Sequence, residues 1–201
     1  MEVLIFPDAQ SLARKSADLV ESQIKTFPDS VIGLATGSTP QGLYDELIRR
    51  HKDYHLSFAR VKTFNLDEYV GIPANHPQSY RTFMDDNLFT KINIVSSNTQ
   101  VPDGMAENPL DVGPAYEKMI EEAGGIDLQV LGVGTDGHIG FNEPTSSLGS
   151  ITRVKTLTKQ TIEDNSRFFK PDEFQPKLAI TMGIKTILDA RRIILLAYGE
   201  N

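Results

Sequence analysis

The chain has 201 residues, a formal net charge of −7 and a sequence pI of about 5.1, and it contains no cysteine. This length suits one domain with a hydrophobic core of its own, and the missing cysteines exclude disulfide bonds and thiolate metal sites. The acidic balance disfavours a broad basic surface for nucleic acid, and we find neither a signal peptide nor an apolar run of about 18 residues for a membrane span. We therefore expect a cytoplasmic protein without nucleic-acid or membrane partners.

Strands and helices alternate along the chain, because its apolar residues switch between short runs and helical spacing. Asp8 is typical of a helix N-cap and Pro40 of a first helical turn. In chain order, the expected elements are a strand at residues 3–6, a helix at 8–27, a strand at 31–35, a helix at 40–50, a strand at 61–65, helices at 79–89 and 112–123, strands at 126–133 and 152–158, a helix at 159–169, a strand at 177–182, a helix at 184–190 and a strand at 192–197. This alternation predicts an α/β fold built on a mostly parallel sheet.

The turn Thr36-Gly-Ser-Thr connects an expected strand to the helix that begins at Pro40. Gly37 lets the backbone approach a ligand, and Ser38 and Thr39 add hydroxyl donors beside the free amides of a first helical turn. The lysine-containing pattern of a nucleotide-triphosphate loop is missing, so a single phosphate monoester fits this turn better. An ordinary strand-to-helix connection with a capping hydroxyl is the alternative.

Arg167, near the end of the expected helix at residues 159–169, is the best candidate for a fixed cation that binds a phosphate. A guanidinium group binds a phosphate through two parallel hydrogen bonds. A surface arginine at a helix end, without a ligand, is the alternative.

Asp67 and Glu68 follow the expected strand at residues 61–65 and so lie at its carboxyl end. Because ligands bind at the carboxyl edge of parallel sheets, one of these carboxylates is a candidate base, with the other turned away from the crevice. Two solvated surface side chains are the alternative.

Side chains that can move or orient protons are concentrated at residues 131–144, directly after another expected strand. Asp136, His138 and Glu143 stand there among four glycines. Taken singly, they have simpler explanations, namely a tight turn, a structural histidine and a helix entrance. Their density after a core strand favours a functional site. A metal site built from the same three residues is disfavoured, because no second histidine stands at ligand spacing.

Together these segments resemble the glucosamine-6-phosphate deaminases of the glucosamine/galactosamine-6-phosphate isomerase family. The likeness spans essentially the whole chain, and its segments in order are Thr36-Gly-Ser-Thr-Pro, Phe64-Asn-Leu-Asp-Glu-Tyr-Val-Gly, His76-Pro-Gln-Ser-Tyr, Gly132-Val-Gly-Thr-Asp-Gly-His-Ile-Gly-Phe-Asn-Glu-Pro and Asn165-Ser-Arg-Phe-Phe. The resemblance implies a single-domain, modified doubly wound (Rossmann-like), mostly parallel sheet with helices on both faces.

The resemblance also implies a hydrolase of amino-sugar metabolism that converts glucosamine 6-phosphate and water into fructose 6-phosphate and ammonia, without a metal or organic cofactor. It implies that Asp67 takes the proton from carbon 2 and returns it at carbon 1. His138 would open the pyranose ring with help from Asp136 and Glu143. The phosphate-binding residues that it implies are Gly37, Ser38, Thr39 and Arg167. Imidazole suits ring opening near neutral pH, and flanking carboxylates fix its tautomer.

Two other functions remain open. The glycine turn and the Asp-Gly-His segment also resemble 6-phosphogluconolactonase, a hydrolase that would use His138 to activate water and would need no base at Asp67. A non-catalytic sugar-phosphate sensor, like the effector domains of some bacterial transcription regulators, is the other. In such a sensor the full set of Asp67, Asp136, His138 and Glu143 is not expected.

The expected last strand ends close to Asn201, although a parallel strand needs cover on both faces. We therefore expect one domain over residues 1–201 that lacks its C-terminal segment, including a phosphate-binding lysine that the family pattern places soon after Asn201. Ser146, Arg153 and Lys155 match an effector site of larger hexameric relatives. The shorter members that this chain resembles are usually monomers, so we expect a monomer.

Overall fold

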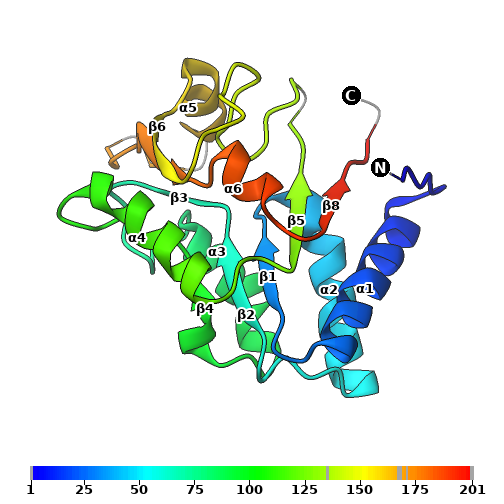
Figure 1. Ribbon diagram of the computed structural model, residues 1–201. Helices are drawn as coiled ribbons and strands as arrows, with labels where there is room; N and C mark the ends of the chain where they lie inside the picture. Colours follow the sequence, from blue (N-terminus) through cyan, green and yellow to red (C-terminus); the bar gives the residue numbers. More distant parts are fainter. Residues whose placement is uncertain (1, 135, 167–168, 171, 200–201) are drawn as a thin grey trace.

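A central sheet of five parallel strands organises the fold (Figure 1). The computed structural model describes residues 2–134, 136–166, 169–170 and 172–199. The strands lie in the order β4-β2-β1-β5-β8, and their bounds are β1 Val31–Leu34, β2 Lys62–Asn65, β4 Thr99–Gln100, β5 Leu128–Gly132 and β8 Ile193–Leu196. The mostly parallel sheet that the sequence predicts is confirmed.

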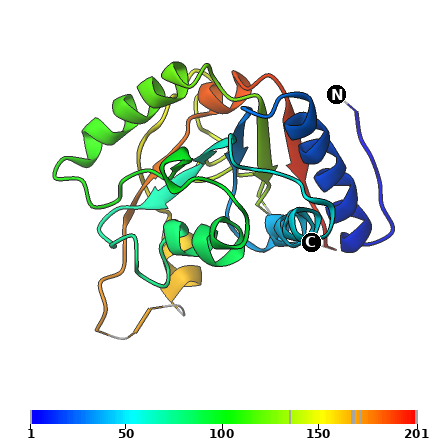
Figure 2. The same cartoon turned by 90° about the horizontal axis from the view of Figure 1, so that it is seen from below.

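Helices cover both faces of this sheet (Figure 2). Their bounds are α1 Ala9–Thr26, α2 Ser38–Tyr54, α3 Tyr80–Asn87, α4 Pro109–Glu122, α5 Lys159–Ser166 and α6 Ile184–Leu188. On one face α1, α2 and α3 bury Ile32 and Leu34 of β1, and on the other α4 and α6 bury Val31 and Phe64. Of the helices in the described ranges, none is both long and apolar enough to cross a membrane.

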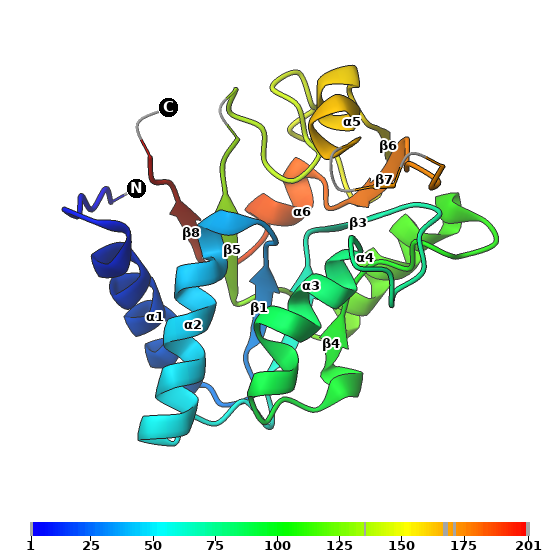
Figure 3. The ribbon, with the colours of Figure 1, turned by 180° about the vertical axis from the view of Figure 1, so that it is seen from behind.

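A smaller antiparallel sheet lies beyond the carboxyl ends of the central strands, with α5 beside it (Figure 3). Its order is β3-β7-β6, with bounds β3 Asp67–Tyr69, β7 Leu178–Thr181 and β6 Arg153–Thr156. Leu66 joins the two sheets: its N–H donates to the carbonyl of Leu34 at 2.9 Å, and its carbonyl accepts from the N–H of Met182 at 2.7 Å. Asp67 therefore begins the second sheet directly after the first one ends.

The strand expected at residues 3–6 is wrong. Val3 and Ile5 are 71% and 91% exposed, and no strand in the described part of the chain pairs with this segment. An apolar run forms a stable strand only beside hydrogen-bonded neighbours, which periodicity alone cannot supply. Phe27, expected on the buried face of the first helix, is instead its C-cap residue and is 58% exposed.

Other differences from the expected elements concern where helices begin and which short elements lie between them. The helix expected from Pro40 begins at Ser38, after Gly37 at a φ of 97°, and α4 begins at Pro109 because the side chain of Asn108 caps it. Between α3 and α4 lie β4 and two short 3-10 helices, at Phe89–Lys91 and Ser96–Asn98, which are not among the elements expected from the sequence.

Arg50 on α2 ties this helix to α1. Its guanidinium group, 9% exposed, donates to Glu46 at 3.0 Å, to Asp18 at 2.8 Å and to Glu21. A fourth hydrogen bond, 3.0 Å long, reaches the carbonyl of Arg14. A buried charge is tolerated only when opposite charges and hydrogen-bond acceptors surround it. Because Arg50 has such partners on both helices, its role is structural.

We expect Arg50→Met to lower the free energy of unfolding by roughly 3 kcal/mol, because carboxylates that now share one cation would be left facing each other. Urea denaturation followed by circular dichroism measures the loss. Arg49→Met is the matched control, since Arg49 also pairs with Glu46 but its side chain is 44% exposed. It should cost much less, and equal losses in the two variants would contradict the structural role of Arg50.

Candidate active site

A cavity of about 700 Å³ opens at the carboxyl ends of the central strands. The loops after β1, β2 and β5 all contribute to its wall, as expected where connections leave a parallel sheet. Six of the eight residues that the sequence predicted for the site line this cavity, namely Gly37, Ser38, Thr39, Asp67, His138 and Glu143. Asp136 contacts His138, and Arg167 lies outside the described residues.

The turn after β1 presents the first turn of α2 to the cavity. Gly37 is the N-cap at a φ of 97°, a conformation that favours glycine, and within the described residues no side chain caps this helix. The hydroxyl of buried Tyr44 donates to the carbonyl of Ala35 and holds the end of β1. The amides of Ser38 and Thr39, with the positive end of the helix dipole, therefore make a site for an anion.

Asp67 lies at the junction of the two sheets and is only 5% exposed. Burial, with a smaller contribution from the neighbouring Glu68, raises the pKa of Asp67 to about 8. The phenol of Tyr116 fixes the backbone just before it, donating to the carbonyl of Asn65 at 2.9 Å. In this site Asp67 is a carboxyl group that gains and loses a proton near neutral pH.

Glu68 faces away from the cavity, so the sequence correctly predicted that the two carboxylates point apart. Its carboxylate accepts the backbone N–H groups of Tyr80 and Arg81 at the start of α3, both at 3.0 Å. The N–H of Tyr69 adds a third bond of 2.8 Å. Glu68 therefore anchors a helix end, which leaves Asp67 as the carboxylate of the cavity.

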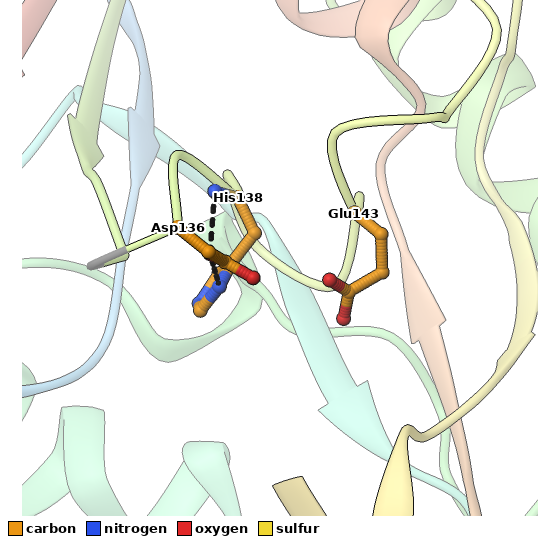
Figure 4. A group of neighbouring side chains, drawn as sticks. All are labelled: Asp136, His138 and Glu143. Atoms are coloured by element: carbon orange, nitrogen blue, oxygen red, sulfur yellow. Dashed lines mark hydrogen bonds and ion pairs between the residues drawn. The ribbon is translucent and has the colours of Figure 1, made fainter. Parts of the chain in front are cut away.

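Asp136 and His138 form a close pair in the loop after β5 (Figure 4). Oδ1 of Asp136 lies 2.7 Å from Nδ1 of His138 and accepts the backbone N–H of His138 at 3.1 Å. These bonds lower the pKa of Asp136, so the carboxylate stays ionised and Nδ1 carries the ring proton. When the ring is neutral, Nε2 is the nitrogen that can accept a proton. The ring lies against Gly134, where a Cβ would stand 2.1 Å from Cε1.

Glu143 lies on the later part of the same loop (Figure 4). Asp136, His138 and Glu143 each have a potential ligand atom within 4.8 Å of the others, so a cation could be held here. The donor set includes only one imidazole, and Nδ1 of that imidazole is already bonded to Asp136. This arrangement suits proton transfer at His138 better than a structural metal site.

An aromatic wall, formed by Tyr69, Tyr80 and Phe141, closes the cavity beside Asp67. The rings of Tyr80 and Phe141 stack with centroids 6.1 Å apart, and the hydroxyls of Tyr80 and Tyr69 are 3.2 Å apart. Tyr80 and Phe83 share one helical face with the buried Met84, and both line the cavity. Helical spacing marks them as one face but does not say that a ligand shares it.

Comparison with known proteins gives a consistent result. The family model of "Glucosamine-6-phosphate isomerases/6-phosphogluconolactonase" matches residues 7–201. The glucosamine-6-phosphate deaminase of Shewanella woodyi is 57% identical over the whole chain, which covers 76% of that relative. The deaminase of Thermoanaerobacter sp. (strain X514) is 50% identical over the whole chain, which covers 79% of it.

Two solved structures show the same fold. A monomeric glucosamine-6-phosphate deaminase superposes with a TM-score of 0.93 at 42% identity, covering 97% of this chain and 81% of its own. A 6-phosphogluconolactonase from Thermotoga maritima gives a TM-score of 0.71 at 18% identity, covering 96% of this chain and 81% of its own. The second likeness extends to the fold alone.

We expect Asp67→Asn to stabilise the protein at neutral and alkaline pH. The folded-state pKa of Asp67 is raised from 3.8 to about 8. Between these values the folded state holds a proton that the unfolded state releases, so this residue makes the free energy of unfolding fall as the pH rises. The asparagine amide does not titrate, so the variant should exceed the wild type by roughly 1–3 kcal/mol at alkaline pH.

Urea denaturation at pH 5 and pH 8.5 measures this difference. Asp86→Asn, which changes an exposed carboxylate of α3, is the control and should show no such pH dependence. A stability difference between Asp67→Asn and wild type that is the same at both pH values would contradict the raised pKa.

Proposed function

Because the chain belongs to the glucosamine-6-phosphate isomerase and 6-phosphogluconolactonase family, we propose that it is a glucosamine-6-phosphate deaminase. It converts glucosamine 6-phosphate and water into fructose 6-phosphate and ammonia. The relatives at 50% and 57% identity carry that name. The structural observation that carries the proposal is the buried Asp67, which shares one cavity with His138 and an anion-binding helix end.

In this proposal the phosphate of the substrate binds at the first turn of α2. The support is the positive φ of Gly37 and the exposed amides and hydroxyls of Ser38 and Thr39 on the cavity wall. Arg167 completes the phosphate site in the proposal, on the strength of its motif. Holding the phosphate at one end fixes which carbons of the sugar face Asp67.

Ring opening is assigned to His138. Its Nε2 accepts the proton of the anomeric hydroxyl, and the resulting imidazolium ion donates to the ring oxygen as the carbon–oxygen bond breaks. Asp136 holds the ring orientation through Nδ1 at 2.7 Å. Glu143, whose carboxylate lies within 4.8 Å of this pair, stabilises the transient positive charge.

Asp67 then moves a proton between neighbouring carbons. It takes the proton from carbon 2 of the open aldehyde while a proton of the substrate's ammonium group passes to the aldehyde oxygen, and it returns the carbon proton to carbon 1, which leaves a protonated imine at carbon 2. Water adds to that imine and ammonia departs, giving the ketose. A pKa of about 8 makes Asp67 a stronger base than an ordinary carboxylate, and the ammonium group of the bound substrate favours its ionised form.

The lactonase alternative explains the site less well. Lactone hydrolysis needs a group that activates water, which His138 could be, but it needs no buried carboxylate poised to accept a proton from carbon. The lactonase structure from Thermotoga maritima is 18% identical, against 42% for the deaminase structure. The sensor alternative explains neither the raised pKa of Asp67 nor the hydrogen-bonded Asp136–His138 pair.

We further propose a monomeric, cytoplasmic enzyme with one domain over residues 1–201. The family match from residue 7 to residue 201 supports the single domain. The deaminase structure at 42% identity is described as monomeric, which supports the monomer. The cysteine-free composition suits a reducing cytoplasm.

The deciding experiment measures fructose 6-phosphate and ammonia formed from glucosamine 6-phosphate, with 6-phosphogluconolactone as the parallel substrate and a chelator present throughout. Equal yields of the two products, insensitive to the chelator, are expected. Hydrolysis of the lactone alone would move the assignment to the lactonase. Absence of turnover on both substrates, also in a chain extended past Asn201, would favour the sensor.

We expect His138→Gln to lower kcat for the closed sugar by at least about 100-fold, because an amide cannot accept and return a proton near neutral pH. Steady-state kinetics on glucosamine 6-phosphate measures the loss. His51→Gln is the control, since the His51 ring bonds the carbonyl of Leu56 at 2.7 Å and is not part of the cavity wall. Near-normal turnover in His138→Gln would contradict the role of His138 in ring opening.

A further inference from the structure

A tight turn at residues 139–142 separates the two side chains of the loop to which we assign ring opening and charge stabilisation. His138 directly precedes it and Glu143 directly follows it. Ile139 and Asn142 close the turn with two backbone hydrogen bonds, of 3.2 and 3.0 Å. The geometry of this turn therefore sets the spacing and the relative direction of the two side chains.

The turn is packed directly against Asp67. Gly140 has a φ of 59°, and a Cβ at this position would stand 3.0 Å from Oδ2 of Asp67 and 2.9 Å from Oγ1 of Thr181. The N–H of Phe141 donates to the same Thr181 hydroxyl at 3.2 Å. A small displacement of the turn would thus change the position of the ring-opening groups relative to Asp67.

Asn142 holds the turn in place. Its side chain is 2% exposed, and Nδ2 donates to the carbonyl of Ile139 at 3.0 Å and to that of Met182 at 2.7 Å. Met182 is the residue whose N–H bonds Leu66, directly before Asp67. Met182, directly after β7, therefore holds both the turn and the backbone next to Asp67.

Arg153 on β6 fixes which way the Asn142 amide points. Its Nη2 donates to Oδ1 of Asn142 at 2.8 Å. A guanidinium group only donates and a carbonyl only accepts, so the Asn142 amide can satisfy its three neighbours in one orientation alone. Burial lowers the pKa of Arg153, which shows that this guanidinium is partly withdrawn from water.

We propose that Asn142, held by Arg153, is a positioning residue that sets His138 and Glu143 against Asp67 for ring opening and proton transfer. The inference rests on the proposed deaminase function and deepens it. Asn142 touches neither substrate nor reacting atoms. It acts through the backbone of the turn, so its loss should reduce kcat while substrate affinity remains, because the phosphate turn at Gly37 is not attached to it.

The test uses Asn142→Asp, which keeps the size and the acceptor for Arg153 but turns the donor toward Ile139 and Met182 into an acceptor. We expect kcat for glucosamine 6-phosphate to fall about 100-fold, as for a misplacement of about 1 Å, with KM changed less than about threefold. Binding of the reduced, ring-free analogue 2-amino-2-deoxyglucitol 6-phosphate, measured by calorimetry, should also change less than about threefold.

Arg153→Met and the double variant test the pair. Arg153→Met should lower kcat about tenfold, and the double variant should lose no more than Asn142→Asp alone, since coupled residues are not additive. Asn93→Asp is the matched control: the Asn93 side chain also both accepts and donates, from the N–H of Phe58 at 2.7 Å and to the hydroxyl of Ser57 at 3.1 Å, but it lies outside the cavity wall, so kcat should not change.

A kcat within threefold of wild type in Asn142→Asp would overturn the inference, as would strictly additive losses in the double variant. If Asn142→Asp fails to fold, Arg153→Met decides alone, and an unchanged kcat there overturns the inference. Failure of the function itself is distinguishable, because the wild type would then produce no ammonia from glucosamine 6-phosphate.

Discussion

The burial of one carboxyl group, that of Asp67, is the constraint on which the rest of the site depends. A buried carboxylate is costly unless it is paired, and among the described residues no basic side chain offsets the raised pKa of Asp67. The fold tolerates that cost because hydrogen bonds define the backbone just before Asp67, from Tyr116 to the carbonyl of Asn65 and from the two sheets to Leu66. The surrounding structure thereby maintains a carboxyl group of raised pKa, at some expense of stability.

The other parts of the site use backbone geometry more than side-chain charge. The end of α2 offers amides and a helix dipole where Gly37 opens the turn, and the loop after β5 bonds to itself around His138. This use of backbone groups in place of charged side chains suits an acidic protein that binds an anionic substrate. Backbone amides attract a phosphate locally without the basic surface that would attract nucleic acid.

Much of this could be predicted from the sequence, because strand order along the chain and the rule for parallel sheets place successive loops at one edge. That logic placed the Gly37 turn, Asp67 and His138 at the same edge, and in the structure they line one cavity there. The sequence pattern could not predict which strands pair over long range. Residues 3–6 look like a strand, but no strand in the described part of the chain pairs with them. The composition of β7 is that of a parallel strand, but β7 pairs antiparallel with β3.

The same limit explains the residues of the site that the sequence did not reveal. Strand alternation separates Asp67 from Glu68 but leaves open which one faces the ligand, until the position of α3 decides it. Helical spacing groups Tyr80 with Met84, although one lines the cavity and the other is fully buried. Local patterns give the faces of an element, and only the tertiary structure says what each face meets.

The connection at Leu66 has a mechanical consequence. This residue bonds the parallel sheet through its N–H and the antiparallel sheet through its carbonyl, so it is a joint between the two sheets. If one sheet rotated about this joint, each atom would be displaced in proportion to its distance from it. Asp67, adjacent to the joint, would be displaced least, and Thr161 on α5, which also lines the cavity, would be displaced more. A change in the width of the cavity would therefore leave the proposed base almost in place.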